Sequence, residues 1–309
     1  MTERQQVRVA GRTLAVSNLD RVLYPASGTT KAEVLRYYLE VAEVLLPHLA
    51  GRPVTFRRFP DGVDAEGFFQ KRCPPHRPDW MATLAVARSD PDEAIEHCAL
   101  DDAAGLAWAA NLAAIELHVP MGRSPDLDRP TAVVFDLDPG PGTGLLECAW
   151  LAVRIRDVLA TLELRCVVKA SGGKGLQVYL PVDPAVTTFD DSRAFAQTLA
   201  RGLEGQHPDR VVTTQRRAAR EGKILIDWTQ NHRIKTTVCA YSLRAGSRPT
   251  VAAPLRWEEV ELARDTGVSD DLVFEPTSMP ARIDELGDTF AAALEATQRL
   301  PTLREARGE

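Results

Sequence analysis

Two aspartates at the end of an apolar run are the residues of this sequence best suited to chemistry. Apolar and acidic residues alternate in Phe135-Asp136-Leu137-Asp138, and a Pro-Gly-Pro-Gly turn follows. Successive side chains of a strand point to opposite faces, so the two carboxylates should share a face, about 7 Å apart between Cα atoms. Neighbouring carboxylates repel unless a cation lies between them, and oxygen ligands suit Mg²⁺ or Mn²⁺. The alternative is that these aspartates only solvate a turn.

A glycine-rich loop between two expected strands is the second candidate. It reads Ser171-Gly172-Gly173-Lys174-Gly175, between the apolar residues 166–170 and the alternating residues 176–181. Glycines let backbone N–H groups approach an anion closely, and Lys174 adds positive charge. The spacing is not that of a Walker loop, and no helix follows. Most such loops are hairpin turns, and that interpretation stays open.

A third carboxylate follows another β-run. Residues 224–228 read Ile-Leu-Ile-Asp-Trp, and they place Asp227 upstream of His232, Arg233, Lys235 and Arg244. Three carboxylates that hold two metal ions, with cationic donors for a triphosphate, form the device for in-line nucleotidyl transfer. One ion lowers the pKa of a primer 3′-hydroxyl, and the other neutralises the leaving pyrophosphate. The combination predicts a two-metal nucleotidyltransferase.

Composition places the chain among ordinary globular proteins. Its 309 residues are 44% hydrophobic and 26% charged, enough for one large domain or two modules. Residues 1–6 are polar, and no apolar run approaches the ~20 residues of a membrane span, so we expect a cytoplasmic protein. The net charge of −6 argues mildly against a general nucleic-acid binder. Local basic clusters at residues 52–72 and 216–223 can still dominate, although such clusters are more often solvated faces.

The cysteines suggest a reducing environment. There are five, an odd number, and no two form a CxxC pair, which favours reduced thiols. A zinc site built from Cys73, His76, His97 and Cys98 is a weaker alternative. Adjacent ligands such as His97 and Cys98 fit a tetrahedral site poorly.

Periodicity predicts the elements that position these groups. Apolar residues recur at three- and four-residue steps over residues 31–48, and residues 145–164 carry a single polar stripe, as in amphipathic helices. Residues 102–113 and 190–204 are also expected to be helical. Residues 121–130 resemble a linker and suggest a boundary between modules. Strands are expected at residues 54–59, 83–88, 95–99, 115–119, 133–138, 166–170, 176–181 and 224–228.

Longer motifs give the chain a family resemblance. They are Gly51-Arg52-Pro53, Arg57-Arg58-Phe59-Pro60-Asp61-Gly62, Gly67-Phe68-Phe69-Gln70-Lys71, Ile115-Glu116-Leu117-His118, Phe135-Asp136-Leu137-Asp138-Pro139-Gly140, Ser171-Gly172-Gly173-Lys174-Gly175-Leu176 and Tyr241-Ser242-Leu243-Arg244-Ala245. Together they resemble the polymerase domain of bacterial DNA ligase D, a branch of the archaeo-eukaryotic primase superfamily. The likeness runs from about residue 18 to about residue 260. It implies an α+β primase-polymerase fold, with an RRM-like antiparallel catalytic sheet and an N-terminal α/β module.

The resemblance also implies domains and residue roles. The expected ranges are residues 1–125 for the α/β module, 126–265 for the catalytic module and 266–309 for a helical tail, together one compact polymerase domain. The two Mn²⁺ or Mg²⁺ ions are expected on the catalytic residues Asp136, Asp138 and Asp227. The nucleotide is expected at His118, Ser171, Lys174, Gln177, Lys235 and Arg244. DNA is expected at Lys31 and Lys71, which would read a 5′-phosphate, and at Phe68 and Phe69, which would pack on a base.

The implied activity is that of a DNA repair primase-polymerase. It would extend a primer 3′-hydroxyl with NTP or dNTP at short gaps or double-strand-break ends, in non-homologous end joining. The expected partners are gapped or broken double-stranded DNA with a 5′-phosphate, a Ku-type end-binding protein and a separate ATP-dependent DNA ligase. The last follows because 309 residues leave no room for a ligase module, so we expect a stand-alone polymerase. We expect a nucleoid-associated cytoplasmic location and no membrane partner.

Two departures from the family pattern leave an alternative open. The family has histidine where this chain has Gln177, which should face the aspartates and cannot carry a proton's charge. Lys235, in a segment where the family usually has small residues, is our candidate for restoring that charge. The alternative function is a catalytically weakened or inactive DNA-end-binding module. A small-molecule phosphotransferase is a more distant one, and it predicts no preference for 5′-phosphorylated gaps.

Overall fold

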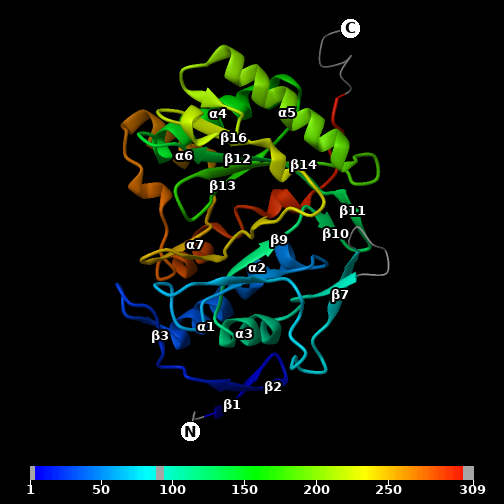
Figure 1. Cartoon of the computed structure of the whole chain (residues 1–309), viewed down its shortest axis with the longest axis vertical. Helices are drawn as coiled ribbons and strands as arrows, with labels where there is room; N and C mark the ends of the chain where they lie inside the picture. The colour runs from blue at the N-terminus through cyan, green and yellow to red at the C-terminus, as the bar shows by residue number, and fades with distance from the viewer. Residues whose placement is uncertain (1–3, 88–93, 302–309) are drawn as a thin grey trace. The chain divides into compact units, whose positions relative to one another are not determined.

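The computed structural model describes residues 4–87 and 94–301, which form two compact units of mixed helix and sheet. Figure 1 shows the helices and strands along the chain. Unit 1 contains Met1–Pro120, Thr236–Ala252 and Phe274–Gly287, and unit 2 contains Met121–Lys235, Ala253–Val273 and Asp288–Glu309. Both units are discontinuous. The predicted module at residues 126–265 and the predicted tail at residues 266–309 are therefore each divided between the two units.

The six-stranded sheet of unit 2 carries the acidic strand at its centre. The strand order is β15-β16-β12-β14-β13-β20, and only the β15–β16 pair is parallel. Phe135 and Leu137 of β12 are fully buried, and helix α4 packs against β12 and β14. The strands are β15 (Val211–Val212), β16 (Ile224–Asp227), β12 (Ala132–Pro139), β14 (Leu176–Pro181), β13 (Val167–Ala170) and β20 (Pro254–Leu255).

Helices and a hairpin complete unit 2. Residues 121–130, predicted to be a linker, instead pair as strands β10 (Gly122–Arg123) and β11 (Asp126–Pro130). Gly122 permits this pairing, since a Cβ there would lie 2.2 Å from the carbonyl oxygen of Leu127. The helices are α4 (Leu145–Thr161), α5 (Phe189–Gln206), α6 (Trp257–Thr266), η1 (Arg217–Ala219), η2 (Trp228–Gln230), η3 (Asp270–Leu272) and η4 (Ala291–Leu294).

Unit 1 is built on a four-stranded sheet of order β17-β9-β5-β6. Its strands are β17 (Thr237–Val238), β9 (Ala114–Val119), β5 (Thr55–Arg58) and β6 (Phe68–Gln70). Short pairs join β1 (Arg4–Val9) to β2 (Arg12–Ser17), β3 (Val22–Tyr24) to β4 (Thr29–Thr30), β7 (Thr83–Ala87) to β8 (Ala94–Cys98), and β18 (Leu243–Ala245) to β19 (Pro249–Val251). The helices are α1 (Lys31–Glu40), α2 (Ala42–Leu49), α3 (Ala103–Asn111) and α7 (Met279–Leu286).

The helix predicted over residues 31–48 is two helices. Thr30 and Glu33 form a capping box that begins α1. The helix ends at Glu40, Val41 is its C-cap, and α2 starts at Ala42. Within α2, Pro47 lacks the N–H that would bond to the carbonyl of residue 43. The apolar periodicity continues across the break, so periodicity alone could not locate it.

Three buried tyrosines explain why a late segment belongs to unit 1. The hydroxyl of Tyr37 donates to the carbonyl of Tyr241 (2.7 Å), and that of Tyr24 donates to the carbonyl of Arg244 (2.9 Å). Tyr38 donates to the carbonyl of Ile115 (2.6 Å) in β9 and accepts from the N–H of Leu243 (3.1 Å). Burial raises the pKa of all three hydroxyls, so they stay protonated donors. These bonds, together with the pairing of β17 with β9, attach residues 236–252 to unit 1.

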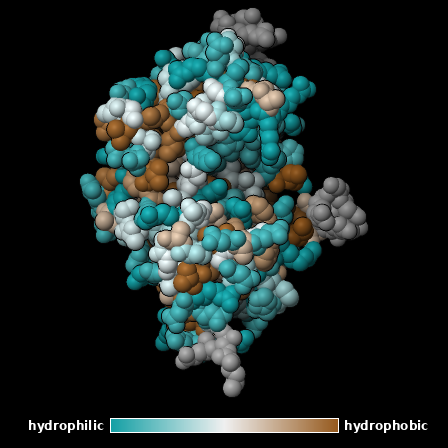
Figure 2. All heavy atoms as spheres, turned by 60° about the vertical axis from the view of Figure 1, so that its left-hand side comes forward, coloured by the Kyte–Doolittle hydropathy of each residue, from teal (hydrophilic) through white to brown (hydrophobic). Residues whose placement is uncertain are grey.

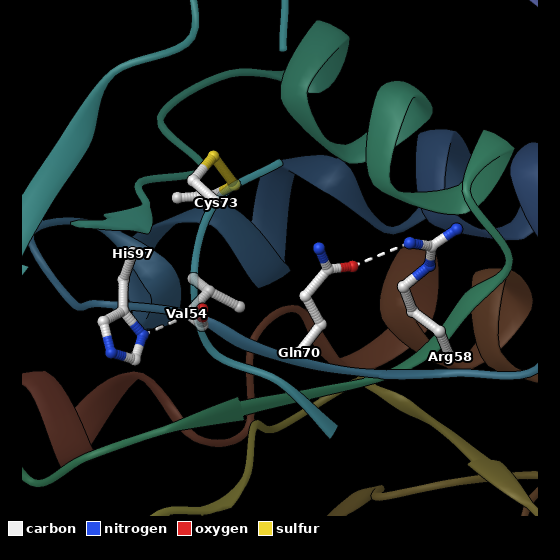
Figure 3. The surroundings of a disulfide bond; sticks show 6 residues. Val54, Arg58, Gln70, Cys73 and His97 are labelled. Carbon is white, nitrogen blue, oxygen red and sulfur yellow. Dashed lines mark hydrogen bonds between the residues drawn. A yellow bond between two sulfur atoms is a disulfide. The ribbon is translucent and has the colours of Figure 1, made fainter. Parts of the chain in front are cut away.

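The prediction of five reduced cysteines is wrong for two of them. Cys73 and Cys98 form a disulfide, while Cys148, Cys166 and Cys239 keep their thiols. Figure 3 shows this disulfide near Val54 and His97. The N–H of Cys73 bonds to the carbonyl of Glu96 (2.7 Å), which brings together cysteines separated by 25 positions in the sequence. A zinc site using both cysteines is thereby excluded in this structure.

Figure 2 shows a face on which hydrophilic residues predominate and hydrophobic residues occur in small groups. Among the large hydrophobic residues of the described ranges, Phe68 and Phe69 are exposed, by 46% and 59%. No helix within residues 4–87 and 94–301 is long and apolar enough to cross a membrane.

Candidate active site

A row of four polar residues crosses the sheet of unit 2. Lys169 of β13 lies opposite Gln177 of β14, Gln177 lies opposite Asp136 of β12, and Asp136 lies opposite Asp227 of β16. Residues directly opposite in antiparallel strands point to the same face, so these four side chains share a face, which we call the polar row. Asp138, two residues after Asp136, points to the same face. The register therefore brings together the three carboxylates and Gln177.

Hydrogen bonds fix the orientation of Gln177 in the polar row. Its Nε2 donates to Oδ1 of Asp136 (3.0 Å), and its Oε1 accepts from the hydroxyl of Tyr179 (3.3 Å). The tyrosine ring packs edge-to-face on Phe290, with ring centroids 5.2 Å apart. Because a hydroxyl that donates to Oε1 leaves the amide nitrogen for Asp136, Tyr179 determines which end of the amide faces the carboxylate.

Asp227 is held by the turn that follows it. Its Oδ1 accepts from the backbone N–H of Thr229 (3.0 Å) and from the Thr229 hydroxyl, and its Oδ2 accepts from Nε2 of Gln230 (3.0 Å). The residue is 6% exposed and caps η2. It does not point into the apolar interior, but three hydrogen bonds already occupy most of the acceptor sites of its carboxylate.

Electrostatics favour a cation beside Asp136. Desolvation and then the charge of Asp138 raise the pKa of Asp136 to about 7, and Asp227 adds to this rise. The hydrogen bond from Gln177 and the charge of Lys169 act in the opposite direction. The positive charge beside the three neighbouring carboxylates is too small to balance their negative charges. As hard oxygen donors, these carboxylates suit Mg²⁺ or Mn²⁺.

The carboxylates are not already gathered around one point. Across residues 4–87 and 94–301, no group of three or more His, Cys, Asp or Glu side chains is arranged to hold a metal ion. The donor chemistry and the register fit a divalent ion, whereas the hydrogen bonds of Asp227 to Thr229 and Gln230 direct its carboxylate to its own turn. Metal binding would therefore use the remaining acceptor site of Oδ2 or displace one of these partners.

Lys169 is a member of the row that the sequence did not single out. It is 1% exposed, and its Nζ lies 5.7 Å from the centroid of the Tyr179 ring. A lysine inside an apolar strand run was the available signal. Lys235, our candidate for a compensating charge, is exposed, and none of the described contacts of unit 2 joins it to the row. Its role stays a prediction.

The glycine loop closes the hairpin between β13 and β14. The Ser171 hydroxyl accepts from the N–H groups of Gly173 (3.2 Å) and Gly175 (3.3 Å), and Lys174 is exposed. Gly175 is buried, and a Cβ at this position would lie 2.0 Å from the carbonyl oxygen of Leu137. This glycine therefore serves the close approach of β14 to β12.

We expect Gly175→Ala to destabilise the protein by about 1–3 kcal/mol, because backbone in the central strand must move. Urea unfolding monitored by circular dichroism measures this. Gly202→Ala is the matched control, since nothing lies within 4 Å of a Cβ in that position of α5. Alanine there should be neutral or stabilise by up to about 1 kcal/mol. Equal stability of Gly175→Ala and wild type would contradict the packing role.

In unit 1, cationic side chains converge on the buried carboxylate of Glu116. Oε1 accepts from Arg57 (3.0 Å) and from the N–H of Ala245 (3.0 Å). Oε2 accepts from Nε2 of His118 (2.7 Å) and lies 3.4 Å from a guanidinium nitrogen of Arg244. The Glu116 side chain is 1% exposed. We call this group the Glu116 cluster, and it joins both nucleotide-binding candidates of unit 1.

Charge and burial compete within the Glu116 cluster. Burial alone would raise the pKa of Glu116, but the hydrogen bond from His118 and the charge of Arg244 outweigh it and lower that pKa to about 2. For His118 burial wins, and its pKa is lowered although Glu116 acts in the opposite direction. Glu116 is therefore ionised and His118 neutral at neutral pH. Residues two apart on a strand share a face, which places Glu116 beside His118, but the sequence did not show that Arg57 and Arg244 reach the same carboxylate.

Exposed aromatic rings stack on arginines beside this cluster. Arg57 lies 5.5 Å from the centroid of the Phe69 ring, and Arg58 lies 5.3 Å from that of Phe68. The Arg58 guanidinium is fixed by Oε1 of Gln70 (2.7 Å) and by the carbonyl of Leu112 (2.8 Å) (Figure 3). Rings held in this way offer a rigid surface on which a base could stack.

The two lysines expected at a 5′-phosphate differ in their surroundings. Lys71 is exposed, whereas Lys31 is 5% exposed and donates to the carbonyl of Ser17. Burial, then the charges of Arg21 and Arg58, lowers the pKa of Lys31 to about 8. A groove of about 510 Å³ next to this lysine is lined by Ser17, Asn18, Arg21 and Ala32, among others. Sequence reasoning missed Arg21, which lines the groove directly.

The family of the chain follows from comparison with known proteins. Residues 30–290 match the family model described as LigD, primase-polymerase domain. The chain belongs to the LigD primase-polymerase domain family. Members of this family are DNA-directed nucleotidyltransferases. The resemblance stated from the motifs is thereby confirmed.

Relatives and a solved structure agree with this family. The chain is 38% identical over 297 residues to the multifunctional non-homologous end joining protein LigD of Mycolicibacterium smegmatis, covering 94% of this chain and 38% of the relative. It is 34% identical over 248 residues to the bifunctional LigD of Bacillus subtilis, covering 80% and 39%. The polymerase domain of Mycobacterium tuberculosis ligase D, solved in complex with DNA, superposes with a TM-score of 0.83 at 37% identity, covering 92% of this chain and 99% of that one.

These matches confirm the predicted fold class, and they show how much of each relative the chain covers. The structure contains mixed helix and sheet, and the sheet of unit 2 is largely antiparallel, as the LigD primase-polymerase resemblance implied. The chain spans just over a third of the length of the curated relatives. The predicted site residues are divided between the units. Unit 1 contains His118, Arg244, Phe68, Phe69, Lys31 and Lys71, and unit 2 contains Asp136, Asp138, Asp227, Gln177, Ser171, Lys174 and Lys235.

Proposed function

We propose that this chain extends a primer 3′-hydroxyl with NTP or dNTP at short gaps or double-strand-break ends, as a polymerase of non-homologous end joining. The observation that carries the proposal is the register that places Asp136 opposite Asp227 and beside Asp138 on one sheet face. Carboxylates so placed repel, as the raised pKa of Asp136 reflects, and a site of this kind gains stability from divalent cations.

Asp136, Asp138 and Asp227 would hold two Mn²⁺ or Mg²⁺ ions. When bound, the ions would activate the 3′-hydroxyl and neutralise charge on the leaving pyrophosphate. Gln177 orients Asp136 through its amide nitrogen, and Tyr179 holds that amide in place. Ser171 and Lys174 would contact the triphosphate, for which the exposed ammonium of Lys174 is suited.

Unit 1 would contribute the remaining contacts. His118 and Arg244 of the Glu116 cluster would bind the nucleotide phosphates, and Phe68 and Phe69 would stack on a base. Lys71 would bind the 5′-phosphate beyond a gap, together with Arg21 in the groove beside Lys31. Gapped DNA with a 5′-phosphate is the proposed substrate, consistent with a related polymerase domain solved with DNA. A Ku-type protein, an ATP-dependent ligase activity and a nucleoid-associated cytoplasmic location belong to the same proposal.

Primer extension with Mn²⁺ on a gapped duplex tests this function. The downstream strand carries either a 5′-phosphate or a 5′-hydroxyl, and products are resolved by length. We expect extension, with several-fold preference for the phosphorylated gap because a phosphate gains charge-assisted contacts. Extension without that preference would contradict the proposed DNA contacts, and no extension with either NTP or dNTP would contradict the enzyme.

A DNA-end-binding module with weakened catalysis is the second candidate. The observation that favours it is the engagement of Asp227 by Thr229 and Gln230, which competes with metal binding. Gln177 also favours it, because a neutral amide beside Asp136 supplies no positive charge for catalysis. Tight, phosphate-dependent binding of gapped DNA without extension in the same assay would support this candidate over the polymerase.

A further inference from the structure

The bond between His118 and Glu116 determines the tautomer of the histidine. Nε2 of His118 lies 2.7 Å from Oε2 of Glu116, and the carboxylate also accepts from Arg57 and the N–H of Ala245. An ionised carboxylate can only accept hydrogen bonds, so Nε2 must carry a hydrogen. In the neutral ring, Nδ1 is then the nitrogen that carries no hydrogen. Any proton that His118 gains is therefore gained at Nδ1.

Charged groups on several elements surround this histidine. Glu116 is on the same strand, Arg57 comes from β5 and Arg244 from β18. The ring edge of β6 Phe69 lies against the imidazole, with centroids 5.5 Å apart. Val238 of β17 lies opposite His118 and cannot titrate. The hydroxyls of Tyr24 and Tyr38, which also face Glu116, are held as donors to backbone carbonyls.

The cluster without ligand keeps the imidazole neutral. Two guanidinium groups repel a third positive charge, the single carboxylate is shared among all donors, and His118 is 8% exposed. A bound triphosphate would bring several negative charges next to the same three side chains. This changes the balance from repulsion between cations to attraction for an anion, so protonation of the ring becomes favourable.

We propose that Glu116 is a positioning residue that holds Arg57, His118 and Arg244 as one triphosphate-binding cluster, and that nucleotide binding there is coupled to uptake of a proton at Nδ1 of His118. The proton comes from solvent, and no covalent bond changes. The inference rests on the proposed function, because it takes the nucleotide triphosphate as the ligand. It makes nucleotide affinity dependent on pH and on a carboxylate that does not itself contact the nucleotide.

Titration calorimetry of the full chain with the magnesium complex of ATP, without DNA, tests the coupling. The measurement is made near neutral pH in two buffers of different ionisation enthalpy, whose difference in heat gives the number of protons taken up. Magnesium keeps the terminal phosphate deprotonated, so the ligand supplies no proton. The uptake assigned to His118 is the difference in proton number between wild type and His118→Asn, in which any proton released by Asp136 cancels. We expect this difference to be about 0.5–1 proton per nucleotide. The magnesium complex of inorganic tripolyphosphate should show the same uptake if the phosphates are what the cluster binds.

Variants separate positioning from general stability. Glu116→Gln cannot hold two guanidiniums and an imidazolium, so affinity should fall about 10–100-fold and proton uptake should disappear. Glu275→Gln, which alters an exposed ion pair with Arg248 in the same unit, is the matched control and should resemble wild type. If Glu116→Gln does not fold, His118→Asn decides the matter, because its nucleotide binding must lack the proton that wild type takes up at His118.

Several results would overturn the inference. These are equal proton uptake by wild type and His118→Asn, unchanged affinity in a folded Glu116→Gln variant, or no nucleotide binding by wild type. Failure of the proposed function looks different. A chain that binds nucleotide with proton uptake but does not extend a primer would refute the polymerase and leave the coupling intact.

Discussion

Asp136→Asn should abolish primer extension and at the same time stabilise the folded protein above about pH 7. Asparagine keeps the size of the side chain and can still bond to Gln177. It removes one of three neighbouring negative charges, and with it a metal-ligating carboxylate. Loss of such a ligand should reduce the rate by about 10³-fold or more, since both reacting oxygens depend on metal ions in two-metal sites.

The stability effect follows from the pKa of Asp136. Its value in the folded protein is about 7, raised by desolvation and by Asp138, whereas an unperturbed aspartate titrates near 3.8. The folded state therefore binds the proton more tightly, and the wild type loses stability as pH rises between these values. Above pH 7 the whole penalty is present, about 1–4 kcal/mol. Asparagine does not titrate, so its variant should lose none of this stability.

Urea unfolding at about pH 5 and pH 8 in the presence of a chelator measures the effect. The variant should be the more stable protein at the higher pH, and the difference should shrink at the lower one. Mn²⁺ should raise the melting temperature of wild type but not that of the variant. Asp128→Asn, an exposed aspartate of unit 2 paired with Arg233, is the control and should match wild type in both assays. Extension within tenfold of wild type would contradict the role of Asp136.

The polar row shows how far sequence reasoning reached. Strand alternation placed Asp136 and Asp138 on one face and turned Gln177 toward them, and the register agrees. Alternation describes one strand at a time, so it could not show that Lys169 lies opposite Gln177 or that Tyr179 orients the amide. It also could not show that Asp227 turns back to cap η2, because that depends on the backbone of the turn.

The Glu116 cluster and the disulfide mark where sequence reasoning stopped. Arg57 reaches Glu116 across 59 positions of sequence through the pairing of β5 with β9, and the N–H of Ala245 reaches it across 129 positions from β18. The cysteine pair was missed because its approach depends on how the loop after β6 meets β8. Motif comparison located His118 and Arg244, but the carboxylate that joins them needed the fold. Contacts between distant segments are what local patterns leave out.

Gln177→His should raise the rate of nucleotide incorporation by about 10–100-fold, because a protonated imidazole is a charge-assisted donor where the amide is neutral. Gln177 lies directly opposite Asp136 and already donates to it at 3.0 Å, so a histidine there has a carboxylate that favours its charged form. Lys169 does not replace this charge. It is one strand further from Asp136, and its ammonium lies over the Tyr179 ring.

Single-turnover incorporation on the gapped duplex, with wild type and variant at matched Mn²⁺ concentration, measures this gain. Gln177→Ala should lower the rate about tenfold or more, because Asp136 loses its orienting partner. Lys235→Ala serves as a comparison: a rate equal to wild type would show that the exposed lysine supplies none of the missing charge. A Gln177→His rate no higher than that of wild type would mean that the row works with a neutral donor. The glutamine would then be an adaptation of this chain rather than a loss.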